Sequence, residues 1–264
     1  MPSVSNIAVG ALVAGSAASK ARHGMNESIA RLSTGMRSMY GGDAAGQSVA
    51  NTLEARSKSW AVAARNAEDG ISAAQTAESA LLEIAALAQR LRELGIQNDN
   101  AALLSSTSDV AAMNAEAEAI YDSIDAIVSK ATFNGVSLLG TSAVTLNIGV
   151  TDDGGTVALK TSDAIAAVTS YTQAISADVT ADATLEDVAI SLGHVAAGIA
   201  ALKGRQAVAY AASANLAAAA SRIEDTDFAK ETANLAKNSV LNQSAMAMVA
   251  QANQAQSAIL AVLQ

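Results

Sequence analysis

The sequence contains no cysteine, and its only proline is Pro2. Disulfide bonds, thiol catalysis and thiolate metal sites are therefore excluded, while the compartment stays open because extracellular proteins need not carry disulfides. Aromatic residues make up only 3% of the 264 residues, so a core of large rings is not expected. Alanine, leucine, glutamine, glutamate and methionine favour helices and fill most long segments. The composition predicts a mainly α-helical protein whose small side chains let helices approach closely.

An excess of basic residues is also missing, because 16 lysines and arginines stand against 25 aspartates and glutamates, a formal net charge of −9. Nucleic-acid binding needs a basic surface that neutralises phosphates, so no nucleic-acid partner is expected. No stretch approaches the roughly 18 to 20 uninterrupted apolar residues of a spanning helix, so we expect no membrane insertion. No lysine or arginine precedes Lys20, so the basic leader of a cleaved signal peptide is missing too.

Residues for catalysis or ligand binding are scarce as well. The two histidines, His23 and His194, lie in helical patterns without a neighbouring nucleophile or ligand set. The acidic run Glu224, Asp225 and Asp227 lacks the glycine-punctuated loop of a calcium site, and carboxylates near a helix N-terminus explain it better. The sequence therefore predicts no catalytic residues, no metal site, no cofactor and no enzymatic activity.

Apolar residues at alternating steps of four and three are present near both ends of the chain. Such a stripe lets one helix lie along another in a coiled coil, although the same spacing also serves ordinary packing within one chain. We interpret the two stripes as surfaces for self-assembly. Their residues are Ile7, Ala11, Ala14, Ala18, Met25, Leu32, Leu241, Ala245, Met248, Ala252, Ile259 and Val262.

Between the stripes, the pattern predicts long helices and one hairpin. A break at 33–43 precedes a helix from Ala44 to about Gln97, and a second helix runs from about Asp109 to Lys130. Alternating apolar residues on either side of an Asp-Asp-Gly-Gly turn predict a β-hairpin at about 143–160. A third helix is expected from about 184 to 216. The fold class is thus mainly α, with long antiparallel helical rods, terminal coiled-coil helices and a small β-hairpin.

Several successive runs resemble bacterial flagellin. Residues 31–35 (RLSTG), 43–51 (DAAGQSVAN), 66–72 (NAEDGIS) and 75–81 (QTAESAL) are similar to runs of that family, in the family's order. Residues 89–94 and 132–135 continue the likeness, and 221–228 (SRIEDTDF) and 251–254 (QANQ) do so at the other end. The resemblance covers about 30–140 and 184–264. The intervening segment is short, so the family's variable outer domains are absent.

The resemblance implies a subunit that self-assembles into the flagellar filament used for swimming. It implies residues 1–40 and 221–264 as the two parts of an inner coiled-coil domain, and 41–220 as a rod domain. It also implies export through the flagellar channel to an extracellular location, with homopolymer contacts, a filament cap, hook-junction proteins and an export chaperone as partners. A hook–filament junction protein and, from another class, a helical signalling rod remain the alternatives.

The resemblance carries one further expectation about a host partner. In flagellins that activate Toll-like receptor 5, the main receptor contact is formed by residues whose types are matched here by Gln89, Arg90, Leu94 and Glu116. The same residues could instead serve contacts between subunits, which we take as their primary role.

Overall fold

The computed structural model describes residues 2–37, 42–105, 107–165 and 176–263, apart from the side chains at 2–8, 101, 259–260 and 262–263. The chain divides into two compact units. Unit 1 comprises Met1–Ala55 and Leu216–Gln264, and unit 2 comprises Arg56–Asn215. These bounds differ from the division at 40/41 and 220/221, which concerns the subunit within an assembly and stays a prediction.

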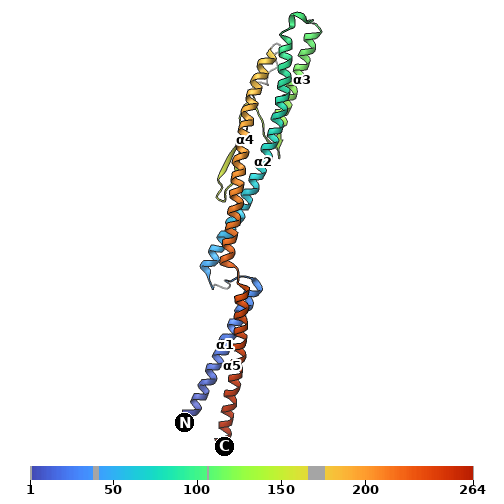
Figure 1. Ribbon diagram of the computed structural model, residues 1–264. Coiled ribbons are helices and arrows are strands. Elements are labelled where there is room, and N and C mark those ends of the chain that lie inside the picture. Colours follow the sequence, from blue (N-terminus) through green and yellow to red (C-terminus); the bar gives the residue numbers. More distant parts are fainter. Residues whose placement is uncertain (1, 38–41, 106, 166–175, 264) are drawn as a thin grey trace. The chain divides into compact units, whose positions relative to one another are not determined.

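Unit 2 is a bundle of long helices. It contains the greater part of α2 (Ala44–Asn98) and α4 (Ala177–Glu224), the whole of α3 (Asp109–Lys130) and the short 3-10 helix η1 (Ala101–Leu103). Figure 1 shows α3 and α4 running alongside α2. Helix α4 extends beyond the predicted 184–216 at both ends. The glycines inside that range, such as Gly193 and Gly204, do not interrupt it, because packing rather than intrinsic propensity stabilises a helix of this kind.

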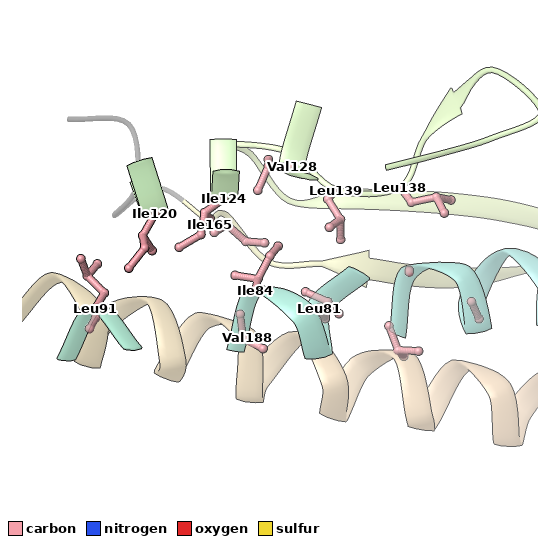
Figure 2. Packing of buried hydrophobic residues seen from close by; sticks show 14 of the residues in the cluster. Leu81, Ile84, Leu91, Ile120, Ile124, Val128, Leu138, Leu139, Ile165 and Val188 are labelled. Carbon is pink, nitrogen blue, oxygen red and sulfur yellow. The ribbon is translucent and has the colours of Figure 1, made fainter. Parts of the chain in front are cut away.

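The core of unit 2 lies along a continuous seam. On both α2 and α4 the buried positions recur at alternating steps of three and four residues, which keeps one face of each helix against the other. Figure 2 shows the side chains that meet there from α2, α3, α4 and the segment between α3 and α4. The largest fully buried residues of the core are Leu81, Ile84, Leu91, Leu94, Ile124, Leu138, Val150, Leu159, Ile165, Val188, Val195 and Leu202.

Two antiparallel strand pairs follow α3. The predicted hairpin is present as β3 (Val144–Gly149) and β4 (Thr156–Ser162), with Leu146 opposite Leu159. A smaller pair, β1 (Thr132–Phe133) and β2 (Val136–Ser137), was not expected as a β element. Its turn places Asn134 at φ 50° and Gly135 at φ 79°, which are left-handed conformations that asparagine and glycine adopt most readily.

Unit 1 contains the two terminal helices, α1 (Pro2–Thr34) and α5 (Phe228–Leu263). They lie side by side over most of their length (Figure 1). Asp227 starts α5, because its Oδ1 accepts the backbone N–H groups of Ala229 at 3.0 Å and Lys230 at 3.1 Å. This agrees with the interpretation of the acidic run as helix-terminal. Asp43 similarly accepts the Gly46 N–H at 2.8 Å at the start of α2.

One helix of the described chain meets the length and hydropathy criteria for a membrane-spanning segment. Within α4, an 18-residue window has a mean hydropathy of 1.4 and few charges, so by length and composition alone it could cross a membrane. A helix of this kind is weak support for a membrane segment, since alanine-rich core helices pass the same test. The side of α4 that carries Val188, Val195 and Leu202 packs in the core of unit 2.

Candidate assembly surface on the terminal helices

The two terminal helices pair in antiparallel fashion. Arg31 near the end of α1 lies 3.7 Å from the carboxylate of Glu231 near the start of α5. Further along, a Cβ atom added to Gly24 would lie 2.7 Å from Nδ2 of Asn238. Earlier residues of α1 therefore contact later residues of α5, as in an antiparallel pair. The two predicted stripes thus belong to one unit.

The described residues of the α1 stripe face α5 of the same chain. Ala14 and Ala18 are 8% and 5% exposed, and Ala11, Met25 and Leu32 are partly buried. The side chain of Ile7 lies outside the described residues. The α1 stripe is thus largely covered by the chain's own second terminal helix, which is the intramolecular alternative that the spacing left open.

The α5 stripe divides between two faces. Ala245 is 6% exposed and Ala252 is partly buried, whereas Leu241 and Met248 are 48% and 62% exposed. The side chains of Ile259 and Val262 lie outside the described residues. The spacing of apolar residues alone does not decide which of two adjacent stripes on a helix faces its partner. On α5 the covered stripe lies one residue beyond the predicted one, at Asn238, Asn242 and Val249, beside Ala245.

The exposed part of the stripe lines a groove along the α1–α5 pair. The groove has a volume of about 790 Å³. Val9 and Val13 of α1 lie on one side of it, at 55% and 61% exposure, and Leu241 and Met248 of α5 lie on the other. Lys20 and Lys237 also line it. Large apolar side chains left in water on both walls of a groove are typical of a protein–protein contact.

Charge is distributed unequally between the two units. Unit 1 contains seven lysines and arginines and seven aspartates and glutamates, whereas unit 2 contains nine and eighteen. The whole net charge of −9 therefore belongs to unit 2. A neutral unit with an apolar groove can associate without the self-repulsion that a charged one would suffer.

The segments that connect the long helices are joined by a short clasp, which we define as residues 35–37 and 224–226. Backbone N–H groups of Arg37 and Thr226 donate to the carbonyls of Glu224 at 2.6 Å and Gly35 at 2.8 Å. The Arg37 guanidinium adds a bond to Asp43 at 2.9 Å. The Gly46 N–H and, secondarily, Arg37 hold the pKa of Asp43 below its usual value. This clasp was not predicted from the sequence.

The four residues proposed for receptor contact do not share one environment. Arg90 lies 2.7 Å from Glu116 and 2.9 Å from Glu93, and hydrogen bonds to these two carboxylates raise the pKa of Arg90. Gln89 is exposed beside them. Leu94 is 1% exposed and belongs to the core, so the expectation that it touches a receptor directly is corrected. Gln89, Arg90 and Glu116 are exposed, and their contact with a receptor stays a prediction.

The histidines do not form a metal site in the part of the chain that the structure describes. His23 lies 3.4 Å from Glu27 on the exposed face of α1. His194 lies 3.3 Å from Lys160 and 3.7 Å from Asp163, a neighbourhood that the sequence reading did not foresee. Among the described residues, no group of three or more histidines, aspartates or glutamates could hold a metal ion.

Comparison with known proteins identifies the family. The model for the bacterial flagellin N-terminal helical region matches residues 6–143, and the model for the C-terminal helical region matches residues 191–263. A flagellin of Halalkalibacterium halodurans is 34% identical over 249 residues, covering 90% of this chain and 91% of that protein. A flagellin of Bacillus subtilis is 32% identical, covering 90% and 92%.

Among solved structures, the crystal structure of Bacillus cereus flagellin aligns with a TM-score of 0.41 and 25% identity, covering 58% of this chain and 88% of that one. The family matches do not favour a hook–filament junction protein or a signalling rod. The paired terminal helices, the long helices of unit 2 and the two family matches at either end lead to one conclusion: the chain belongs to the bacterial flagellin family and is a structural filament subunit of the extracellular flagellum.

Proposed function

We propose that the groove of unit 1 is the surface through which one subunit binds the next during filament growth. The observation that carries this proposal is the exposure of Leu241 and Met248 opposite Val9 and Val13, after the pairing of α1 with α5 has already covered the alanine stripe. A second copy of the chain is the occupant, because a filament subunit must bury such surfaces against identical neighbours. Burial of apolar area contributes about 25 cal/mol per Å² to association.

A polymerisation assay tests the groove. Purified chain is mixed with short filament seeds and followed by electron microscopy and sedimentation. We expect Leu241→Asp and Met248→Asp to block elongation, because a carboxylate would have to be buried in an apolar contact. Gln243→Asp, on an exposed position of α5 outside the groove lining, is the matched control and should elongate. Normal elongation by the groove variants would contradict the proposal, as would equal loss in all three.

In this proposal the chain reaches the cell exterior through the flagellar export channel, as the family resemblance implies. Residues 1–40 and 221–264 would then form the inner part of the filament, and 41–220 the shell around it. The filament cap, the hook-junction proteins and an export chaperone would be its other partners. Deletion of the export apparatus in a producing cell should retain the chain inside the cell, whereas its continued appearance in the medium would refute this route.

A second candidate role concerns the surface of Gln89, Arg90 and Glu116. The ion pairs of Arg90 with Glu93 and Glu116 fix an ordered, exposed patch on α2 and α3, and this patch is the part of the unit available to Toll-like receptor 5. Soluble chain applied to receptor-bearing cells should signal, and Arg90→Ala should reduce the signal. Lys203→Ala, which changes an exposed cation on α4, is the control. Absence of signalling from the parent chain would dismiss this role.

A further inference from the structure

The interface between α1 and α5 has two chemically different halves. Toward the outer ends of the helices, the facing positions carry alanines and one valine, such as Ala14, Ala18, Ala245 and Val249. Toward the clasp they carry polar side chains, with Glu231 at 7% exposure. The two halves of the interface therefore differ in how strongly they can select one alignment of the helices.

The alanine half cannot define the alignment by itself. Alanine side chains repeated at steps of three and four present nearly the same surface after the helices slide by one turn or by seven residues. Packing selects one arrangement only where shapes differ, and identical methyl groups do not differ. A chain with two such stripes therefore needs another feature to prevent misaligned pairing.

Gly24 and Asn238 supply that feature. The side chain of Asn238 occupies the space where a Cβ atom at position 24 would stand, with Nδ2 at 2.7 Å from it. A slide by seven residues would place Ala17 or Arg31 opposite Asn238, and slides by three or four would place Lys20, Ala21, Glu27 or Ser28 there. Each of these residues has a Cβ atom, so in the neighbouring alignments the Asn238 amide would have to shift away from its observed position against α1.

We call the space at Gly24 that the Asn238 side chain occupies the Gly24–Asn238 notch. The polar contacts on either side of it also favour the observed alignment. Glu231 has a side chain only 9% exposed, and Arg31 is its cation at 3.7 Å. A slide would leave a buried carboxylate without that partner, which is costly. Among the described residues, the buried Oδ1 of Asn242 has no hydrogen-bond partner. A buried asparagine at a seam position lowers the stability of a coiled coil while specifying its alignment. Asn242 should therefore make the polar half of the interface less stable and more specific for one alignment.

We propose that the Gly24–Asn238 notch, supported by the Arg31–Glu231 pair, is a register lock that allows α1 and α5 to pair in only one alignment. The lock acts within a single chain and does not depend on the proposed function of the groove. In a polymer it matters more than in a monomer, because one misaligned subunit would present displaced groove walls to every later neighbour.

Cross-linking tests the lock directly, because the chain has no cysteine of its own. Ala17→Cys with Ser244→Cys, both on the groove, reports the observed alignment. Ala17→Cys with Gln251→Cys reports a slide by seven residues in one direction, and Ala17→Cys with Lys237→Cys a slide in the other. In the parent sequence only the first pair should oxidise to a disulfide. Adding Asn238→Ala should raise the yield of a slid pair about tenfold, and Asn253→Ala, on an exposed position of α5, should leave the yields unchanged.

A double-mutant cycle separates the lock from a general loss of stability. Gly24→Ala alone should loosen the pairing, because the new methyl group displaces Asn238. In the Asn238→Ala background the same change should tighten it, because alanine favours a helix over glycine. Hydrogen exchange of α1 and α5 reports both effects. Equal effects of Gly24→Ala in the two backgrounds would overturn the proposal.

All of these measurements are made on the soluble full chain and again on seeded filaments. If the observed-alignment pair fails to cross-link in both samples, or if Asn238→Ala yields no slid product in either, the register lock is wrong. Failure of filaments to grow would count against the groove alone, since the alignment is read within one chain.

Discussion

Tyr210 on α4 donates its hydroxyl hydrogen to the carboxylate of Glu68 on α2, with an oxygen–oxygen distance of 2.6 Å. Gln206 donates to the same Oε1 atom at 2.8 Å. These two hydrogen bonds are solvent-exposed polar contacts between side chains of the two helices. The hydrogen bond with Glu68, followed by partial burial, raises the pKa of Tyr210.

This raised pKa predicts a pH dependence for unit 2. A tyrosine whose pKa is higher in the folded state than in the unfolded chain stabilises the fold below its ordinary value of 10.0, and the contribution is lost as the pH rises through the folded value. Thermal unfolding followed by circular dichroism between pH 8 and about pH 11 should show a steeper fall for the parent chain than for Tyr210→Phe. Parallel curves would show that the Glu68 contact does not stabilise the fold.

Leu81 and Leu82 are adjacent in α2 but have opposite environments, since Leu81 is fully buried and Leu82 is 55% exposed. Leu81→Ala should destabilise unit 2 by about 2 to 5 kcal/mol, because it leaves a cavity in the core. Leu82→Ala should change the free energy of unfolding by less than about 0.5 kcal/mol. Urea unfolding measures both, and similar values for the two variants would contradict the assignment of the core face.

Two glycines of α4 should respond to the same substitution with opposite signs. A Cβ atom at Gly198 would collide with the Leu159 side chain, whereas nothing lies within 4 Å of one at Gly193. Gly198→Ala should destabilise the chain by about 1 to 3 kcal/mol through overpacking against the hairpin. Gly193→Ala should stabilise it by roughly 0.5 to 1 kcal/mol through helix propensity. A stabilising Gly198→Ala would mean that β4 does not pack closely on α4.

The turn between β1 and β2 requires a left-handed residue at Gly135, whose φ is 79°. Gly135→Ala should cost about 1 to 2 kcal/mol, because an L-side chain is strained in this region. Gly149→Ala is a suitable control, since an added Cβ atom there would meet only Asn66 Nδ2 at 3.8 Å. Amide hydrogen exchange at Val136 and Ser137 should rise in the first variant alone, and unchanged exchange would place the strain elsewhere.

The helices and the hairpin could be predicted because their signals are local. Asp43 and Asp227 precede apolar periodic runs, and alternating residues flank the glycines after Asp153, so the elements and several of their ends follow from short windows of sequence. The limits of α4 could not be predicted in this way. Helix α4 begins at Ala177 and ends at Glu224, and contacts with α2 lie near both ends, at Arg92–Asp182 and Gln47–Glu224. Such long-range contacts are not visible in a short window of sequence, so the predicted limits of 184 and 216 stop short of both ends.

The residues of the assembly surface could not be placed from the sequence, because their exposure depends on contacts between segments that are far apart in the chain. Leu241, Ala245 and Met248 fit one helical stripe, but only the position of α1 decides that Ala245 is covered while the other two face the groove. The clasp likewise joins segments nearly two hundred residues apart, as the Arg37 bond to the Ile223 carbonyl shows. Leu94 was assigned to a surface by resemblance, and its burial follows from packing that a motif does not describe.

The prevalence of alanine at the buried positions has a calorimetric consequence. Unfolding exposes little apolar area per residue when the core side chains are methyl groups such as those of Ala64, Ala67, Ala74 and Ala77, and the heat-capacity increment of unfolding scales with that area. The increment should therefore fall below the usual ~12–15 cal/mol/K per residue. A small increment flattens the dependence of stability on temperature, so the chain should lose little of its stability between a cold environment and a warm one.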